Sequence, residues 1–189
     1  MERTVQKIIN KLEAGNYLSE DMHDMHIYVL QKWLEQLIVS TIIYATALVF
    51  HVVLPTILFH IIYMSIRKHC GGYHCESYAA CFVFSIIMYA TNILMYQLAA
   101  YVIKPLAILC IISVIYIIIT GAKNNENIHW TLEDLSRTSV ITRIYTVIYG
   151  VMICAMWIVG LPEAYIIFSM MGLIYPALTL LIETARISK

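Results

Sequence analysis

Reactive side chains gather in one short stretch of the chain, residues 67–81. Its sequence is Arg-Lys-His-Cys-Gly-Gly-Tyr-His-Cys-Glu-Ser-Tyr-Ala-Ala-Cys, and long apolar runs flank it on both sides. A cysteine attacks as a thiolate, so it needs a base or a positive charge close by. We therefore predict that Cys81 is a thiol nucleophile and that His74 is its base. Cys70 and Cys75 lie in the same stretch and remain alternative nucleophiles on residue type alone.

The spacing of His74 and Cys81 limits how the two side chains can meet. In a straight helix, seven residues with a rise of about 1.5 Å each would separate their Cα atoms by about 10.5 Å, too far for a hydrogen bond. His74 must therefore precede the helix that carries Cys81, or fold back on it. Gly71 and Gly72 allow such a bend, because glycine tolerates positive φ angles and close backbone approach. Their amides could also bind an oxyanion, although a turn is the simpler role.

The same cluster of histidines and cysteines offers enough ligands for a zinc ion. Its members are His69, Cys70, His74, Cys75 and Cys81. However, the cysteines lack the paired Cys-x-x-Cys spacing of structural zinc sites. We therefore expect neither a metal nor another cofactor in this protein.

The composition indicates an integral membrane protein. Apolar residues make up 61% of the 189 residues and charged residues only 13%, whereas an ordinary soluble domain carries about a quarter charged residues. Twelve basic and twelve acidic residues cancel, so the chain has no excess positive charge to attract a nucleic acid. DNA and RNA are therefore excluded as expected partners.

Six apolar segments are predicted to span the membrane within a single all-α, polytopic domain, residues 1–189. Their bounds are 20–54, 55–66, 78–98, 105–120, 140–159 and 164–182. The first two separate at Pro55, because one continuous helix would be longer than the roughly 30 Å hydrocarbon core. Lys104 and Pro105 are expected to lie between the third and fourth spans. The connections 67–77 and 121–139 are predicted to be cytoplasmic, and the second is expected to contain a short helix capped by Thr131.

An amphipathic helix is predicted before the first span, over residues 1–15. Apolar residues recur there at positions i, i+3, i+4 and i+7, namely Val5, Ile8, Ile9 and Leu12. Basic residues line another face of the same helix. Such a helix either lies on an anionic membrane surface or packs on the cytoplasmic face of the protein.

The distribution of lysine and arginine predicts the orientation in the membrane, because cytoplasmic connections are enriched in these residues. With six spans, one side carries nearly all of them and the other carries only Lys104. Those on the first side are Arg3, Lys7, Lys11, Lys32, Arg67, Lys68, Lys123, Arg137, Arg143, Arg186 and Lys189. We therefore place both termini and the reactive stretch in the cytoplasm, where thiols stay reduced.

The reactive stretch also resembles the signature of a known family. Arg67-Lys68-x-x-x-Gly72-x-His74, followed seven residues later by Cys81, is similar to the motif of the accessory gene regulator protein B (AgrB-like) family. Its members are membrane cysteine endopeptidases of Gram-positive peptide quorum sensing. The resemblance includes the chain length, the amphipathic N-terminus and the six-span pattern. It implies that His74 and Cys81 form the catalytic pair, in a multi-pass protein of the bacterial cell membrane.

The resemblance implies a specific reaction and specific partners. Cys81 would attack a carbonyl of a short AgrD-like propeptide that has an amphipathic leader, and an acidic C-terminal tail would leave. An internal cysteine or serine of the propeptide would then attack the thioester and release a thiolactone or lactone signal precursor. Arg67, Lys68, Gly71 and Gly72 are candidates for supporting this chemistry or for binding the substrate. A homodimer embedded in the lipid bilayer is the implied assembly.

Two other classes of function remain open on the sequence. A small transporter or channel would use ionisable or polar residues at membrane depth. The residues concerned would be His51, His60, Asn92 and Glu163. The second class is a noncatalytic membrane protein that binds a metal through the cluster at residues 69–81.

Overall fold

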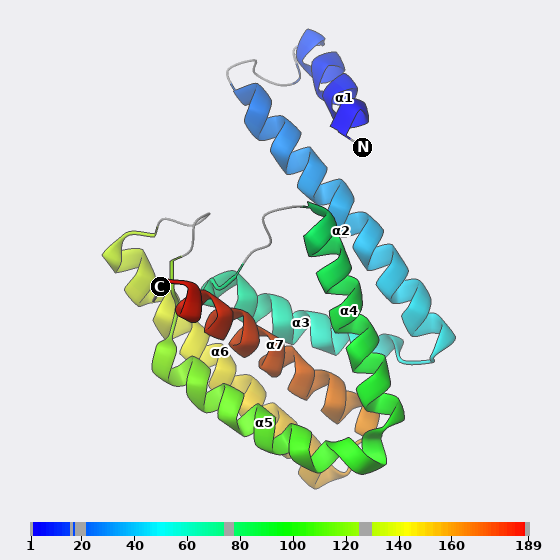
Figure 1. Ribbon diagram of the computed structural model, residues 1–189, viewed down its shortest axis with the longest axis vertical. Coiled ribbons are helices and arrows are strands. Elements are labelled where there is room, and N and C mark those ends of the chain that lie inside the picture. The colour runs from blue at the N-terminus through cyan, green and yellow to red at the C-terminus, as the bar shows by residue number, and fades with distance from the viewer. Residues whose placement is uncertain (1, 16, 18–21, 74–77, 125–129, 188–189) are drawn as a thin grey trace. The chain divides into compact units, whose positions relative to one another are not determined.

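Helices are the main secondary structure in the part of the chain that the structure describes, which contains no strand. The computed structural model describes all residues except 1, 16, 18–21, 74–77, 125–129 and 188–189. Its helices are α1 (Glu2–Ala14), α2 (His23–Val49), α3 (Val53–Cys70), α4 (Tyr78–Gln97), α5 (Ala99–Thr120), α6 (Leu132–Val159) and α7 (Glu163–Ile187) (Figure 1). The prediction of an all-α fold is confirmed for these residues.

The chain divides into two compact units, residues 1–45 and residues 46–189. The first unit contains α1 and most of α2. Nδ1 of His23 lies 2.8 Å from a carboxylate oxygen of Glu13 at the end of α1, and Nδ1 of His26 lies 3.7 Å from the other oxygen. Val5 and Ile9 of α1 are buried. The second unit contains the reactive stretch and all the remaining helices.

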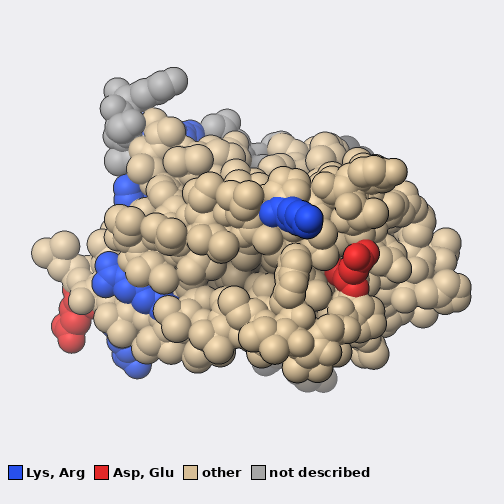
Figure 2. All heavy atoms as spheres, turned by 90° about the horizontal axis from the view of Figure 1, so that it is seen from below, with Lys and Arg blue, Asp and Glu red and all other residues tan. Residues whose placement is uncertain are grey.

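Several helices are long and apolar enough to cross a membrane. Within the described residues there are five of them, α2, α4, α5, α6 and α7. The face of the molecule shown in Figure 2 carries few charged side chains, as expected of a surface that meets hydrocarbon. Helix α3 has 18 residues but is not among the five, because its last turn carries Arg67, Lys68 and His69 and lowers its mean hydropathy. The six-span count therefore stays a prediction.

Helix α7 forms the core of the second unit. In its most apolar part 78% of the residues are buried, against 17–24% in the other four helices of this class. Helix α3 packs closely along it, with Ile62 against Gly172 and the Phe59 ring 6.0 Å from the Tyr175 ring. Hydroxyl groups tie α4 into the same core, because Tyr175 donates to the carbonyl oxygen of Met88 at 2.7 Å.

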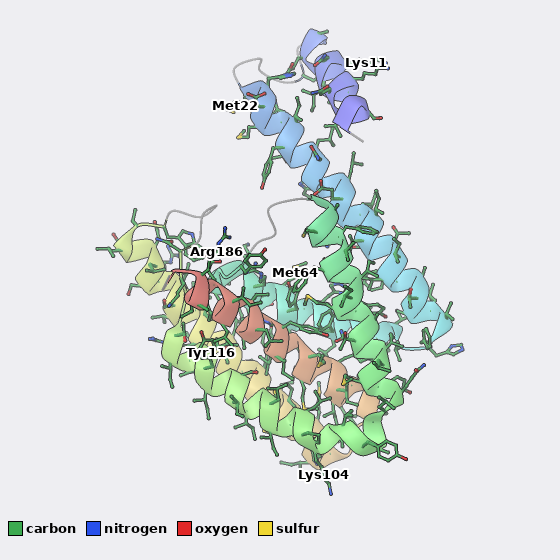
Figure 3. All side chains as sticks on the ribbon, in the orientation of Figure 1. Lys11, Met22, Met64, Lys104, Tyr116 and Arg186 are labelled. Atoms are coloured by element: carbon green, nitrogen blue, oxygen red, sulfur yellow. The ribbon has the colours of Figure 1, made fainter. Side chains whose placement is uncertain are left out.

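The helix directions bring four helix ends together. Helices α3, α5 and α7 run the same way and α6 runs the opposite way (Figure 1). Accordingly, the ring of His69 near the end of α3 stacks on Tyr145 in the first half of α6. We call the resulting region the reactive end, and it comprises residues 67–73, 118–124, 130–143 and 179–186. Figure 3 shows Arg186 at this end and Lys104 at the opposite end of α5.

Two prolines do not break the chain where the sequence analysis placed the breaks. Helix α2 ends at Val49 and α3 begins at Val53, so Pro55 lies in the first turn of α3. Proline is tolerated there, because the amide it lacks would have no partner within the helix. His51 makes the break with φ of 55°, a conformation typical of residues just past a helix end.

Pro105 lies inside α5 rather than between two spans. Helix α5 begins at Ala99 and continues through Pro105 to Thr120. Pro105 has no N–H, so the helix loses one backbone hydrogen bond, to the Tyr101 carbonyl oxygen. The long apolar run that follows favours continuation of the helix. The separation from α4 falls at Leu98 instead.

Helix α6 begins earlier than the predicted fifth span. It starts at Leu132, so the short helix expected in the 121–139 connection is continuous with the segment 140–159. Thr131 caps it as predicted. Its hydroxyl oxygen accepts a hydrogen bond from the Asp134 amide at 3.2 Å, and the Asp134 carboxylate accepts one from the Thr131 amide at 3.4 Å. This reciprocal arrangement is a capping box.

Because α3 packs closely on α7, we predict that a methyl group added at Gly172 lowers the free energy of unfolding. A Cβ atom there would lie 3.0 Å from two atoms of Ile62, whereas at Gly150 the nearest atom would be 4.0 Å away. Alanine favours helix over glycine by about 1 kcal/mol at either position, but overpacking costs about 1–3 kcal/mol. We expect Gly172→Ala to unfold several degrees below Gly150→Ala in a thermal melt of the detergent-solubilised protein. Equal Tm values would contradict this packing.

Candidate active site

Cys81 lies in the first turn of α4 and is exposed. Its carbonyl oxygen accepts a hydrogen bond from Oγ of Ser85 at 2.9 Å. The first turn of a helix has amide groups without helical partners, which favour a negative charge nearby. His74 and Cys75 lie outside the described residues. The pairing of His74 with Cys81 therefore stays a prediction.

Cys70 is placed where it cannot act as the nucleophile. It is completely buried at the end of α3, with Sγ 3.5 Å from the Gly71 carbonyl oxygen. Burial raises the pKa of the Cys70 thiol to about 11, even though Arg67 is nearby. A thiol that stays protonated at neutral pH is a poor nucleophile. This removes one of the alternatives that the sequence left open.

Two further cysteines lie far from the reactive stretch along the chain. Cys110 of α5 and Cys154 of α6 line an apolar cavity of about 450 Å³, together with residues such as Trp157 and Met170. Their surroundings offer no base or positive charge, since the lining residues carry none. Among the described cysteines, Cys81 alone combines exposure with a position in the reactive stretch.

The ring of His69 faces helix α6. Its ring stacks on Tyr145 of α6 with 5.7 Å between ring centroids, and burial together with the charge of Lys68 lowers the pKa of His69. Residues two apart on a helix differ by about 200° around the axis, so His69 and Arg67 project from opposite sides of α3. The ring of His69 is therefore directed toward α6, on the side of α3 opposite Arg67.

Gly71 lets the chain pass close to the connection between α5 and α6. Its φ is 71°, and a Cβ atom there would overlap the carbonyl oxygen of Lys123. The Lys123 amide donates to the Cys70 carbonyl oxygen at 3.0 Å, so the two segments form a short bridge. Asn124 holds this connection in shape, because its side-chain amide accepts from the Trp130 amide at 3.0 Å and donates to the Trp130 carbonyl at 3.1 Å.

Gly72 makes the matching approach to α7. Its φ is 94°, and a Cβ atom there would lie 3.2 Å from backbone atoms of Thr179 and Leu180. The next residue, Tyr73, donates its amide to the Thr179 carbonyl oxygen at 3.0 Å. The glycine pair thus clamps the chain between two backbones, and this close approach is the role that the structure assigns to it. The suggested oxyanion role of the two amides stays a prediction.

Arg67 turns inward, and Lys68 is exposed. One guanidinium nitrogen of Arg67 donates to the Tyr73 carbonyl oxygen. Arg186 lies over the Tyr73 ring, with 5.9 Å from Cζ to the centroid. Arg67 therefore supports the chain that leads to His74, whereas Lys68 remains available to a ligand.

Sequence reasoning missed Tyr73 and Asn124. Tyr73 donates its amide to the Thr179 carbonyl oxygen of α7, and no local pattern reveals a contact between segments so far apart. Asn124 bonds to Trp130, six residues away, and a turn-forming asparagine in a polar run was the available signal.

These features define a class of protein. It is all-helical in its described part, it has several helices that could span a membrane, and it exposes one cysteine beside a glycine-bent loop. A family model described as Accessory gene regulator B matches residues 2–182. The chain belongs to this family, and the resemblance stated from the sequence is confirmed.

One curated relative gives a second comparison. The chain is 30% identical over 89 residues to the accessory gene regulator protein B of Staphylococcus carnosus (strain TM300). The match covers 47% of this chain and 47% of the relative, so it spans about half the length of that protein. No solved structure matches this chain.

The buried and exposed cysteines should differ sharply in reactivity. With a pKa of about 11, only about one Cys70 thiol in ten thousand is ionised at pH 7. We expect iodoacetamide at pH 7 to alkylate Cys81 in the folded protein and to leave Cys70 unmodified until the chain is denatured, as read by tandem mass spectrometry. Alkylation of Cys70 at the rate of Cys81 in the folded protein would show that the assigned burial is wrong.

The close approach at Gly71 can be separated from the effect of its positive φ. Gly160 also has positive φ, but no atom lies within 4 Å of the position of its Cβ. Gly160→Ala should therefore report only the conformational cost, of about 1–3 kcal/mol. Gly71→Ala should in addition release the chain from Lys123 and speed tryptic cleavage after the exposed Lys68 by about tenfold or more. If Gly160→Ala accelerates the same cleavage equally, the bridge is not what protects it.

Proposed function

We propose that the protein is a membrane cysteine endopeptidase that removes the C-terminal tail of a short propeptide and promotes its macrocyclisation. The product is the (thio)lactone precursor of a quorum-sensing signal. The observation that carries the proposal is the exposure of Cys81 at the start of α4, set against the complete burial of Cys70. Membership of the accessory gene regulator B family supports it.

The first step forms an acyl-enzyme. His74 takes the proton of the Cys81 thiol, and the thiolate attacks the scissile carbonyl carbon. The tetrahedral oxyanion collapses, the C–N bond breaks, and His74 returns the proton to the leaving amine of the tail. The propeptide, with its amphipathic leader, remains bound to Cys81 as a thioester.

The second step closes the ring. An internal thiol or hydroxyl of the same propeptide gives its proton to His74 and attacks the thioester carbonyl carbon, and the C–S bond breaks to free the Cys81 thiolate. Exchange of one thioester for another is nearly balanced in energy, so the enzyme must hold the second nucleophile close and keep water away. A cysteine at the edge of an apolar helix bundle suits both needs.

The proposed membrane arrangement has six spans and both termini in the cytoplasm. Counting α3 as a span is supported by its packing along α7 and by its direction, which it shares with α5 and α7. The Cys81 site would then lie at the cytoplasmic face, and α1 would lie at the membrane surface. A homodimer within the lipid bilayer completes the proposed assembly.

Basic side chains at the reactive end are proposed to bind the acidic tail. The exposed ones there are Lys68, Arg137, Arg143 and Arg186. Arg143 is partly engaged, since its Nε donates to the Ile118 carbonyl oxygen at 2.9 Å. Lys68 is nearest to the reactive loop in sequence and is our candidate for the first contact.

The alternative functions gain less support. The described residues contain no group of three or more His, Cys, Asp or Glu side chains that could hold a metal, while His74 and Cys75 lie outside them. The apolar cavity of about 450 Å³ contains none of His51, His60, Asn92 and Glu163, which a transport pathway would use.

Coexpression with the propeptide tests the proposed function directly. A short reading frame next to the gene, with an amphipathic leader and an acidic tail, would supply the substrate. Wild type and Cys70→Ala should release the tail and form the macrocycle, whereas Cys81→Ala and His74→Ala should do neither, as followed by mass spectrometry of the peptide. Unchanged processing by Cys81→Ala would rule out the enzyme described here.

A further inference from the structure

A groove with an open rim and a closed floor lies between α5, α6 and α7. It is the apolar cavity of about 450 Å³ described above. Met170 and Cys110 form its floor, with 1% and 6% of their surfaces exposed, whereas Val151 and Ile111 form its rim, with 64% and 60% exposed. The groove therefore opens at the surface of the helix bundle. Its volume lies within the range of ligand pockets, about 300–1,000 Å³.

The chemistry of the lining restricts what can fill the groove. No lining residue is charged, and aliphatic side chains such as Val114, Ile115 and Val147 make up most of it. Both α5 and α6 are long and apolar enough to cross a membrane, so the open rim is expected to meet lipid. A polar ligand would lose its hydration there without gaining hydrogen bonds. The groove therefore suits a hydrocarbon chain.

The length of the groove matches one leaflet of a bilayer. Along α5 it extends from Ala107 to Ile115, a rise of about 12 Å, and along α6 from Val147 to Trp157, a rise of about 15 Å. The hydrocarbon core of a bilayer is about 30 Å thick, so each leaflet supplies about 15 Å. One acyl chain from one leaflet would fill the groove, whereas a transmembrane helix would extend well beyond it.

One end of the groove lies beside a positive charge. The lining residues of α5 are at positions 107, 110, 111, 114 and 115, which share one face of a helix. Lys104 lies three residues before Ala107, so it continues this face about one turn nearer the start of α5. It is exposed, and Figure 3 shows it extending away from the bundle. Among the described residues Lys104 has no ion-pair partner, so its ammonium group is available to a ligand.

Trp157 lies at the same end of the groove, on α6. Because α6 runs opposite to α5, the last turns of α6 lie at the same end of the bundle as the first turns of α5 (Figure 1). Tryptophan is enriched where the hydrocarbon of a membrane meets the headgroups, and lysine side chains extend from such depths to the headgroups. The two residues therefore place this end of the groove at the level of the lipid phosphate groups.

We propose that the groove binds a phospholipid, with one acyl chain along its floor and the phosphate group on Lys104. This inference is independent of the proposed function. Charge and length together define the ligand. The negative phosphate complements the ammonium group at one end, and a chain attached to it has the length needed to reach the other end.

A second copy of this chain is a poorer occupant of the same groove. A two-fold dimer brings identical patches of its two subunits together, and in a membrane both copies keep the same orientation. Lys104 would then lie near the Lys104 of the other copy. Two like charges would approach each other without a counter-ion, whereas a phosphate group neutralises each of them.

Photoreactive lipids test both parts of the proposal on the full-length protein in detergent micelles. One probe is a phosphatidylglycerol with a diazirine in an acyl chain, and the other is a diacylglycerol with the same chains but no phosphate. Labelling of peptides from α5 and α6 is read by tandem mass spectrometry as the concentration of each probe rises. For the wild type we expect half-maximal labelling at a concentration of the phospholipid about fivefold lower than that of the diacylglycerol.

Two substitutions separate the phosphate site from the groove. Lys104→Gln should raise the half-maximal concentration of the phospholipid about fivefold, to that of the diacylglycerol. Gly150→Leu should raise it about tenfold for both probes, because the new side chain occupies the groove. The backbone has room for this side chain, since a Cβ atom at Gly150 has no neighbour nearer than 4.0 Å. Lys104→Gln changes only the surface, so it tests the phosphate site even where Gly150→Leu lowers the Tm.

Each substitution has a matched control. Lys68→Gln removes one charge at the reactive end, and Gly150→Ala replaces the same glycine but adds only a methyl group. Both controls should label within about twofold of the wild type. Weaker labelling in Lys104→Gln and Gly150→Leu, with both controls unchanged, is the result that supports the proposal.

Three other results would overturn it. Equal affinity of the wild type for both probes would show that no phosphate is recognised. Labelling of the groove peptides that Gly150→Leu leaves unchanged would show that the chain lies elsewhere. A dimer that native mass spectrometry detects for the wild type and not for Gly150→Leu would assign the groove to a second copy.

Discussion

The clamp on residues 70–73 is the contact on which the site depends. The Cys70 carbonyl accepts the Lys123 amide, and the Tyr73 amide reaches the Thr179 carbonyl, so three remote segments meet through their backbones. Side chains at positions 71 and 72 would collide with those backbones. Backbone hydrogen bonds of this kind are directional and need close approach. These hydrogen bonds fix the end of α3 and the starting position of the loop that leads to Cys81.

The helix arrangement explains why the site is chemically distinct from the rest of the molecule. Helix α7 is largely enclosed, while the other apolar helices expose most of their surface. Hydrocarbon can cover those surfaces, but the helix ends and the charges near them must reach water or a polar partner. Arg67 finds such a polar partner in the Tyr73 carbonyl oxygen, to which it donates. The polar end of an apolar bundle thus becomes the place where a thiol and its supporting donors can coexist.

The sequence predicted local features more reliably than the places where helices break. The Thr131 cap was predicted because capping depends on neighbours three residues apart. Pro55 and Pro105 were taken as boundaries, yet one falls in a first turn and the other within α5, because the effect of a proline depends on its position in the helix. Arg67 was considered for substrate binding, but its inward orientation depends on a carbonyl that only the bent loop presents.

The amino-acid order was enough to establish a membrane-type helical protein, the reactive stretch and the family, because composition, hydrophobic runs and a short motif are all local properties. It favoured Cys81 as the nucleophile but kept Cys70 as an alternative, since residue type alone does not separate two cysteines of one stretch. Folding separates them: Cys70 is enclosed at the end of α3 and Cys81 is exposed at the start of α4. Burial and close backbone approach arise from contacts between segments far apart in the chain, and those contacts exist only once the helices have packed.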